Sequence, residues 1–284
     1  MDSVVVKNLV LLTIMRSAPL VLAAMGGFTS ERSGIINIAL EGKMLTAACV
    51  AYLATLVTHN AWIALLAAIG SAILVSLLHW LLTQKYRIDQ IISGMAINTL
   101  AAGGTGYLYT KYNDPNANDL PHLPLPLFWS LAFLLPVGLF LYARLTRGGL
   151  RLFAVGNDPD KARMAGIQPS TIRFWALVAT GVFTGLAGTM IFSSVGQFME
   201  GMTSNRGYIA LAALIVGGWR PLPALGACIA FGFFEGLQLQ LQGTKIAGAD
   251  IPAEVFSSLP YIITVIALAG LLGKSRPPAS LGKI

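Results

Sequence analysis

The sequence predicts an all-α protein: a bundle of helices that cross a membrane. Of its 284 residues, 55% are hydrophobic and only 11% are charged, whereas soluble domains carry about 25% charged residues. Its mean hydropathy is +0.71, and long apolar runs recur along the whole chain. No linker or block of charge divides the chain. We therefore predict one polytopic domain over residues 1–284 with about nine spans, within a range of roughly eight to ten.

The spans are predicted from the length of the apolar runs, because a membrane-crossing helix needs about 20 apolar residues. Ala61–Leu82 and Phe174–Val195 meet this length and contain no Asp, Glu, Lys or Arg. Met1–Phe28 contains two basic residues and Pro19 and has no small-residue cleavage site, so we interpret it as a retained first span. The other predicted spans are Met44–Val57, Ile91–Tyr109, Leu125–Ala143, Tyr208–Trp219, Leu222–Leu241 and Val255–Leu272.

The basic residues predict the orientation of the bundle. The polar stretch 144–173 holds six basic residues and two acidic ones, and loops with such an excess stay in the cytoplasm. If the spans alternate, three further basic segments fall on the same side as this stretch: Lys85 with Arg87, then Arg220, and then the basic tail. Residues 111–123 and 243–254 then fall outside. The net charge of +7 thus indicates topology rather than nucleic-acid binding, and the C-terminus is predicted to be cytoplasmic.

The cytoplasmic loop 144–173 contains a short predicted helix. Asp158 is a good N-cap, Pro159 suits the first helical position, and Gly166 suits the C-terminal cap. So short a helix does not persist alone in water. Either the membrane bundle or a cytoplasmic partner must bury it, which would make it a docking element. A plain surface turn is the alternative.

Polar residues within the apolar spans are the candidates for a solute path, because such residues usually face protein or water. In the stretch 29–42, Ser33 could cap a helix that starts at a cytoplasmic turn. Alternatively, this stretch re-enters the protein and Asn37 lines a path. Asn98 could bond a neighbouring helix or a polar solute. Glu235 could contact a solute or pair with a basic group of a partner subunit.

No catalytic or metal-binding constellation is visible in the sequence. The three histidines are far apart, and neither a His-Glu-x-x-His nor a Gly-x-Ser-x-Gly motif occurs. Residues 270–275 resemble a phosphate-binding loop, but Leu268 stands where that motif requires glycine. We therefore expect no enzymatic activity, no metal and no bound cofactor in this chain.

Four stretches of the chain carry a family resemblance: 27–45 (GFTSERSGIINIALEGKML), 88–98 (IDQIISGMAIN), 151–167 (RLFAVGNDPDKARMAGI) and 206–226 (RGYIALAALIVGGWRPLPALG). Together, and in this order, they resemble the permeases of the branched-chain amino acid, ribose and nucleoside importer superfamily. The sequence of the first stretch is most similar to the shorter permease of nucleoside importers of the basic membrane lipoprotein type.

The resemblance implies a type II importer-like permease of the bacterial cell (inner) membrane. It implies a second homologous permease, a cytoplasmic tandem-cassette ATPase that binds ATP and Mg, and an extracytoplasmic substrate-binding lipoprotein. The expected solute is small and polar, with nucleosides first and a simple sugar such as ribose as the alternative. A stand-alone secondary transporter or channel is a further alternative.

Under this resemblance the short cytoplasmic helix becomes the coupling helix, seated in a groove of the ATPase. Polarity and position alone make Asn37, Asn98 and Glu235 the candidates for the path. The aromatic rings of Phe28 and Tyr107 would suit a nucleoside, and they would suit a sugar equally. The coupling residues would be Asp158, Pro159, Lys161, Ala162, Arg163 and Gly166.

Overall fold

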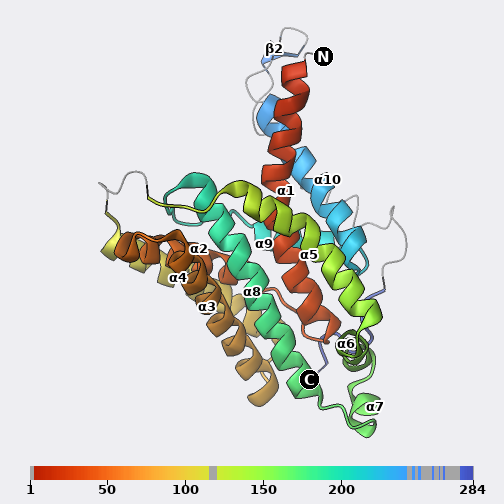
Figure 1. Ribbon diagram of the computed structural model, residues 1–284. Helices are drawn as coiled ribbons and strands as arrows, with labels where there is room; N and C mark the ends of the chain where they lie inside the picture. Colours follow the sequence, from red (N-terminus) through yellow and green to blue (C-terminus); the bar gives the residue numbers. More distant parts are fainter. Residues whose placement is uncertain are drawn as a thin grey trace.

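A computed structural model describes residues 3–114, 120–241 and 276–283, and between the last two ranges only 245–246, 249–250, 258, 262 and 265. Within these residues the fold is helical, apart from one short antiparallel pair of strands (Figure 1). The elements are α1 (Ser3–Arg32), α2 (Leu40–Thr58), α3 (Ala61–Trp80), a π-helical turn η1 (Leu81–Lys85), α4 (Gln90–Tyr112), α5 (Leu125–Leu145), α6 (Arg147–Asn157), α7 (Pro159–Met164), α8 (Pro169–Val195), α9 (Arg206–Val216), α10 (Pro221–Leu241), β1 (Lys245–Ile246) and β2 (Ala249–Asp250).

Six of the described helices are long and apolar enough to cross a membrane. They are α1, α2, α3 with η1, α5, α8 and α10. Helix α4 has 23 residues but is less apolar than these six. The predicted span Tyr208–Trp219 is wrong as a full span: α9 has 11 residues, about 16 Å at 1.5 Å per residue, against a hydrocarbon core of about 30 Å. The predicted span Val255–Leu272 lies outside the described residues, apart from three isolated positions.

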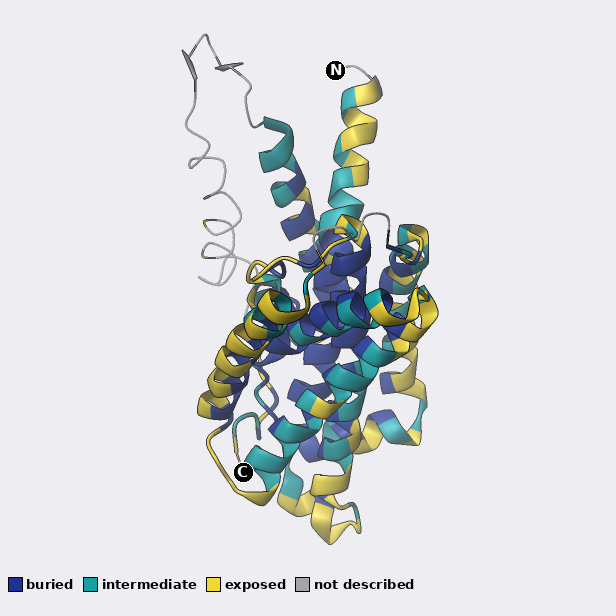
Figure 2. Cartoon of the chain, turned by 90° about the vertical axis from the view of Figure 1, so that its left-hand side faces the viewer, coloured by how far each residue is buried: buried dark blue, intermediate teal, exposed yellow. Residues whose placement is uncertain are grey.

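Helices α1 and α8 form the centre of the bundle. Helix α1 packs against α10, α8, α9 and α5, and α8 packs against α3, α1 and α2. In its most apolar stretch α8 has 83% of its residues buried, whereas α5 has 17%. Figure 2 shows the buried residues in the middle and the exposed ones towards the rim. Because the peripheral helices expose large apolar side chains such as Leu66, Leu100 and Leu134, their outer faces suit lipid rather than water.

Glycines allow the central helices to pack closely. A Cβ atom at Gly181 of α8 would lie 2.5 Å from the Cα of Ile73 in α3. A Cβ atom at Gly232 of α10 would lie 2.6 Å from the backbone N of Ser17 in α1. Any larger residue at either position would push two helices apart, and small residues are typical of such contacts in membranes.

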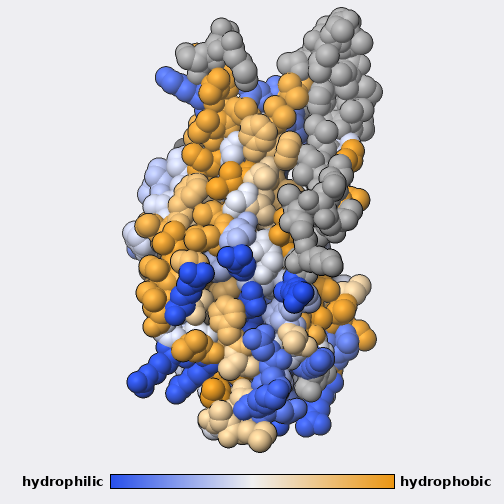
Figure 3. All heavy atoms as spheres, turned by 90° about the vertical axis from the view of Figure 1, so that its right-hand side faces the viewer, coloured by the Kyte–Doolittle hydropathy of each residue, from blue (hydrophilic) through white to orange (hydrophobic). Residues whose placement is uncertain are grey.

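The two ends of the bundle differ in polarity. The N-terminus lies at one end, and the C-terminus, α6 and α7 lie at the other (Figure 1). In the face shown in Figure 3, polar residues gather at the end that holds α6 and α7, and apolar residues cover much of the rest. Arg87, Arg163, Arg173 and Lys283 line one cavity at this end. Three of the predicted basic segments therefore meet on the same side, as alternating spans require.

Candidate functional site

Helix α7 is the short helix predicted from its capping residues, and the structure confirms it. The side chain of Asp158 accepts the backbone N–H of Lys161 at 3.0 Å, and Pro159 is the first helical residue. Gly166 has a φ of +78°, and the N–H of Ile167 donates to the carbonyl of Ala162 at 2.9 Å. This left-handed glycine with its backward hydrogen bond is a standard helix ending.

The charge at the start of α7 is stabilised locally. Hydrogen bonds from the backbone and side chain of Lys161 lower the pKa of Asp158 from its ordinary value. The same Lys161 ammonium lies 3.1 Å from the Asp158 carboxylate. Asp158 is thus ionised at neutral pH, where it caps the helix and complements the positive end of its dipole.

The outer face of α7 is uncovered. Ala162 is buried against the body of the protein, where α7 contacts α6 and α8, whereas Met164 is 88% exposed. The side chains of Lys161 and Arg163 are also exposed. The chain therefore holds one side of the short helix and presents an apolar methionine flanked by cations on the other.

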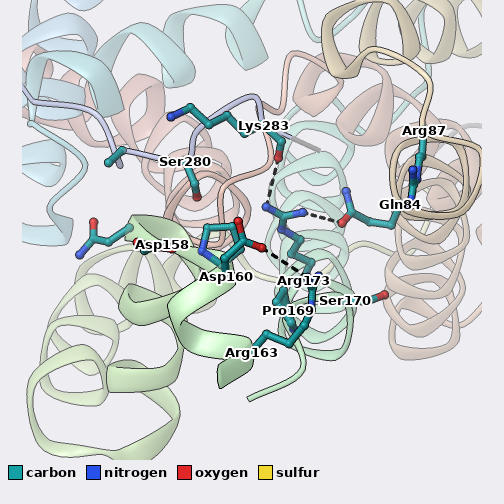
Figure 4. A pocket seen from close by; sticks show the side chains of 13 residues that line it. Gln84, Arg87, Asp158, Asp160, Arg163, Pro169, Ser170, Arg173, Ser280 and Lys283 are labelled. Atoms are coloured by element: carbon teal, nitrogen blue, oxygen red, sulfur yellow. Dashed lines mark hydrogen bonds and ion pairs between the residues drawn. The ribbon is translucent and has the colours of Figure 1, made fainter. Parts of the chain in front are cut away.

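A cavity of about 620 Å³ lies beside α7 (Figure 4), and we call it the tail cavity because residues 279–283 form one wall. Arg173, at the start of α8, joins its walls. Its guanidinium donates to the side-chain oxygen of Gln84 at 2.8 Å, to the carbonyl of Lys283 at 3.2 Å and to the carbonyl of Ser33 at 3.2 Å. One side chain thus connects α8, η1, the tail and the connection between α1 and α2.

The tail, residues 276–283, connects α6 to the same region. The backbone N–H of Ser280 donates to the carbonyl of Gly156 at 3.0 Å, and its hydroxyl donates to the same carbonyl at 2.7 Å. The N–H of Gly282 donates to the carbonyl of Gly34 at 3.1 Å. The tail therefore bridges the end of α6, next to α7, and the start of the 33–39 segment.

The 33–39 segment between α1 and α2 is non-helical and mostly buried. Ser33 does not cap α2: its hydroxyl donates to the Ser30 carbonyl at 2.6 Å, and α2 begins seven positions later at Leu40 without a side-chain cap. The interpretation of this stretch as a cytoplasmic turn with a Ser33-capped helix is therefore wrong. The segment re-enters the protein, as the alternative predicted.

Side chains from other elements supply the hydrogen bonds that this buried backbone needs. The N–H of Ile36 donates to the Gln90 side chain at 2.6 Å, and the N–H of Asn37 donates to Glu31 at 3.3 Å. Asn98 donates to the carbonyl of Ile38 at 3.0 Å. An irregular segment can therefore persist inside the bundle because side chains of α1 and α4 satisfy it.

Asn37 lies at the centre of a buried polar network. It donates to the Ser30 hydroxyl at 2.9 Å and accepts from the ammonium of Lys43 at 2.8 Å. That ammonium lies 3.3 Å from Nδ1 of His79. Sequence reasoning missed Lys43 and His79, although a lysine and a histidine in apolar helices were a visible signal. All four side chains are fully buried, so the network holds the helices together in this conformation.

Asn98 contacts the same 33–39 segment that contains Asn37. Its amide donates to the Tyr208 hydroxyl at 2.7 Å, and its oxygen accepts the N–H of Gly42 at 2.8 Å. Phe28 is fully buried in α1, and Tyr107 is 63% exposed on α4. The structure thus brings Asn37 and Asn98 to one buried segment and places Tyr107 on the surface.

Glu235 of α10 pairs with two arginines of the same chain. Its Oε1 lies 3.5 Å from Arg16 of α1 and 3.3 Å from Arg206 at the start of α9. Both arginines line a cavity of about 460 Å³, which we call the Arg16 cavity. The sequence analysis expected a basic group of a partner subunit as one alternative, whereas the structure pairs Glu235 with two arginines of its own chain.

Two helix starts meet at Glu41. Its carboxylate accepts the Thr203 hydroxyl at 2.6 Å, the N–H of Asn205 at 2.9 Å and the N–H of Gly207 at 2.6 Å. Glu41 lies in the first turn of α2, and its partners lie at the start of α9. One carboxylate thus occupies the positive ends of two interrupted helices.

Comparisons with known proteins agree with this architecture. The guanosine ABC transporter permease protein NupQ of Bacillus subtilis is 34% identical over 99% of this chain and 98% of its own length. The nucleoside ABC transporter permease protein NupC of Lactococcus lactis is 31% identical over 94% of this chain and 92% of its own. A candidate glucose ABC transporter permease, TsgC13 of Haloferax volcanii, is 28% identical over 90% and 89%.

Residues 9–268 match the family described as the branched-chain amino acid transport system permease component. The match covers most of the chain, including the buried 33–39 segment, both interrupted helices and α7. Two relatives above 30% identity align over almost their whole length. The chain is a multi-pass membrane permease that belongs to this family.

Proposed function

We propose that this chain is a permease subunit of a bacterial ATP-driven nucleoside importer. Family membership supports the permease role, and two near full-length relatives are named for guanosine and nucleoside transport. The transport subunits of such importers do not hydrolyse ATP themselves. In this proposal ATP and Mg bind to a cytoplasmic tandem-cassette ATPase, a second homologous permease completes the path, and an extracytoplasmic lipoprotein delivers the solute.

The observation that carries the proposal is the uncovered face of α7. A six-residue helix capped at both ends holds Met164 at 88% exposure beside two cations. So short a helix is not stable alone in water, and a side that this chain leaves uncovered suits a contact with another protein. We assign that contact to the ATPase. Asp158, Pro159 and Gly166 fix the start and end of the helix. The other proposed coupling residues are Lys161, Ala162 and Arg163.

The route from α7 into the bundle follows the contacts described above. Helix α7 follows α6 directly, the tail joins α6 to Gly34, and Arg173 joins the tail to Ser33. A displacement of α7 would therefore reach the 33–39 segment, on which Asn37 and Asn98 converge. These two residues stay our candidates for the solute path in another conformation of the importer, together with Phe28 and Tyr107.

We infer that the chain crosses the membrane nine times as a single domain. The six apolar helices account for six crossings. In this proposal three further crossings come from α4, from α9 together with residues 196–205, and from residues 255–272. The last of these lies outside the described part of the chain, apart from 258, 262 and 265. The termini lie at opposite ends of the bundle, as an odd number requires (Figure 1). We infer from its excess of Lys and Arg that the end with α7 and the C-terminus faces the cytoplasm.

Two measurements test these proposals. Met164→Glu should abolish co-purification of the ATPase and nucleoside uptake, whereas Val57→Glu, at an equally exposed apolar residue (82%) of the opposite end, should keep the ATPase bound. Normal ATPase binding by Met164→Glu would disprove the coupling role. Met164→Cys should react with a membrane-impermeant thiol reagent in inverted vesicles but not in intact cells, and the reverse pattern would disprove the orientation.

A further inference from the structure

The Arg16 cavity lies beside the non-helical segment that separates α8 from α9. Helix α8 ends at Val195, and Gly196, with a φ of +77°, turns the chain into the 196–205 segment before α9 starts at Arg206. Met15 and Arg16 of α1 form the facing wall. Its volume of about 460 Å³ falls within the range of about 300–1,000 Å³ typical of small-molecule sites. Interrupted helices commonly surround such sites in transporters.

Two arginines and one acid, Glu200, line this cavity. Arg16 and Arg206 share the carboxylate of Glu235, and both contact its Oε1. Arg16 lies near the middle of the 30-residue helix α1, about 20 Å from either end at 1.5 Å per residue. A cation at that depth is costly and indicates a functional site. Because each guanidinium carries five N–H donors and both meet the same Glu235 oxygen, donors stay available for an electron-rich guest.

Arg206 has hydrogen-bonding capacity that the described protein does not use. Its Nη2 donates to Glu235 at 3.3 Å. Its Nε is buried, and no acceptor within the described part of the chain reaches it. The side chain is only 12% exposed. A buried N–H without an acceptor is destabilising, so a solute that supplies the acceptor would be bound more tightly.

Apart from Glu200 and two serines, the remaining walls are apolar and deformable. Met15, Met190, Met199 and Met202 line the cavity, and Ser194 and Ser204 add hydroxyl groups. Methionine side chains adapt to flat rings and make favourable contacts with aromatic faces. The cavity therefore combines a soft apolar surface for a ring, donors for its edge, and hydroxyls suited to a sugar.

We propose that the Arg16 cavity binds the base of a 6-oxopurine nucleoside during its passage, with Arg16 and Arg206 donating to the O6 and N7 edge. This inference rests on the proposed function. Guanine presents O6 and N7 as neighbouring acceptors, the pair that arginine recognises best, whereas adenine replaces O6 with an amino donor. The two arginines thus select guanosine over adenosine, and Glu235 holds both in place.

The test measures guanosine and adenosine uptake in cells that produce the whole importer. Arg206→Lys keeps the charge and the ion pair but loses the planar donor pair. We expect the guanosine-to-adenosine uptake ratio to fall about tenfold, and Arg16→Lys to lower it as well. Arg144→Lys, on the exposed end of α5, should leave the ratio unchanged. An unchanged ratio in both cavity variants, with normal uptake, would overturn the proposal.

A second measurement does not depend on the folding of the arginine variants. Both native cysteines are buried, so Ser194→Cys introduces one accessible thiol into the cavity. Guanosine should slow its labelling by a small thiol reagent, adenosine should slow it less, and Thr58→Cys on the exposed end of α2 should be unaffected by either. Equal protection by both nucleosides, or none, would overturn the cavity assignment. If the wild-type importer took up no nucleoside at all, the proposed function itself would be refuted, together with this inference.

Discussion

The carboxylate of Glu41 accepts the backbone N–H of Gly207 at 2.6 Å, so the first turn of one interrupted helix caps the start of another. A Cβ atom at Gly207 would lie 2.4 Å from the backbone N of Glu41, so only glycine allows this approach. The positive ends of α2 and α9 would otherwise face each other without a compensating charge. The Glu41 carboxylate neutralises both and fixes the relative position of the two helices.

Removing this charge should destabilise the bundle. Glu41→Ala leaves the N–H groups of Asn205 and Gly207 without an acceptor, and hydrogen bonds to charged groups contribute about 1.5–3 kcal/mol each. We expect a fall in the thermal unfolding temperature of the purified protein in detergent, with Glu41→Gln intermediate. Asp160→Asn, at an exposed surface pair, should change it little. Equal unfolding temperatures for Glu41→Ala and the wild type would contradict the capping role.

The buried amine of Lys43 should make Asn37 important for stability. Asn37→Leu removes the acceptor at 2.8 Å and leaves a buried donor with one partner fewer, a change that typically costs about 1–3 kcal/mol. Because Lys43→Met removes the donor itself, the double variant should be more stable than Asn37→Leu alone. Chemical denaturation of all four proteins measures the coupling. Additive effects would show that the two side chains do not interact.

Gly34 should tolerate no side chain while the tail is in place. Its φ is +95°, and an added Cβ atom would lie 2.8 Å from the Ser280 hydroxyl. Gly34→Ala is therefore expected to cost more than the roughly 1–2 kcal/mol of left-handed backbone strain alone. Ser280→Gly should relieve the contact but not the strain, so the double variant should regain part of the loss. No recovery would argue against the contact between the tail and the segment.

Helix α7 should loosen in acid. Since the pKa of Asp158 is lowered in the folded protein, its ionised form stabilises the helix above the unfolded carboxyl pKa of about 4. This stabilisation disappears as the pH falls through the lowered folded pKa. A spin label at Met164→Cys should become more mobile in that range. The same label with Asp158→Asn should show no such transition; a matching transition there would point to another group.

The parts of the fold that local sequence determines were predictable. Asp158, Pro159 and Gly166 lie within nine positions and specify the start and end of α7 without help from the rest of the chain. Apolar runs likewise specified α3 and α8. The apolar run 208–219 located α9 to within two residues of its start, but its capping by Glu41 was missed because Glu41 lies far away in the sequence.

The polar sites required knowledge of distant partners. Asn37, Asn98 and Glu235 stood out because each is a polar residue in an apolar run. Lys43 and His79 met the same criterion and were overlooked, and their contact was not predictable because they are 36 positions apart on different helices. Ser33 was misinterpreted because serine before a helix often caps it, whereas here the chain continues for six more residues before α2 begins. Pairing across helices is set by tertiary packing, which a single sequence does not display.

The contact of the tail with Gly34 has a consequence for biogenesis. Residues 33–39 leave the ribosome long before residues 276–283 are translated, yet the Gly34 carbonyl receives its partner from Gly282. Until then this oxygen lacks its native partner at the end of a nascent helical hairpin. A polypeptide arrested before position 276 should thus reach the membrane with its earliest hairpin unfinished, which would mark it for quality-control proteolysis.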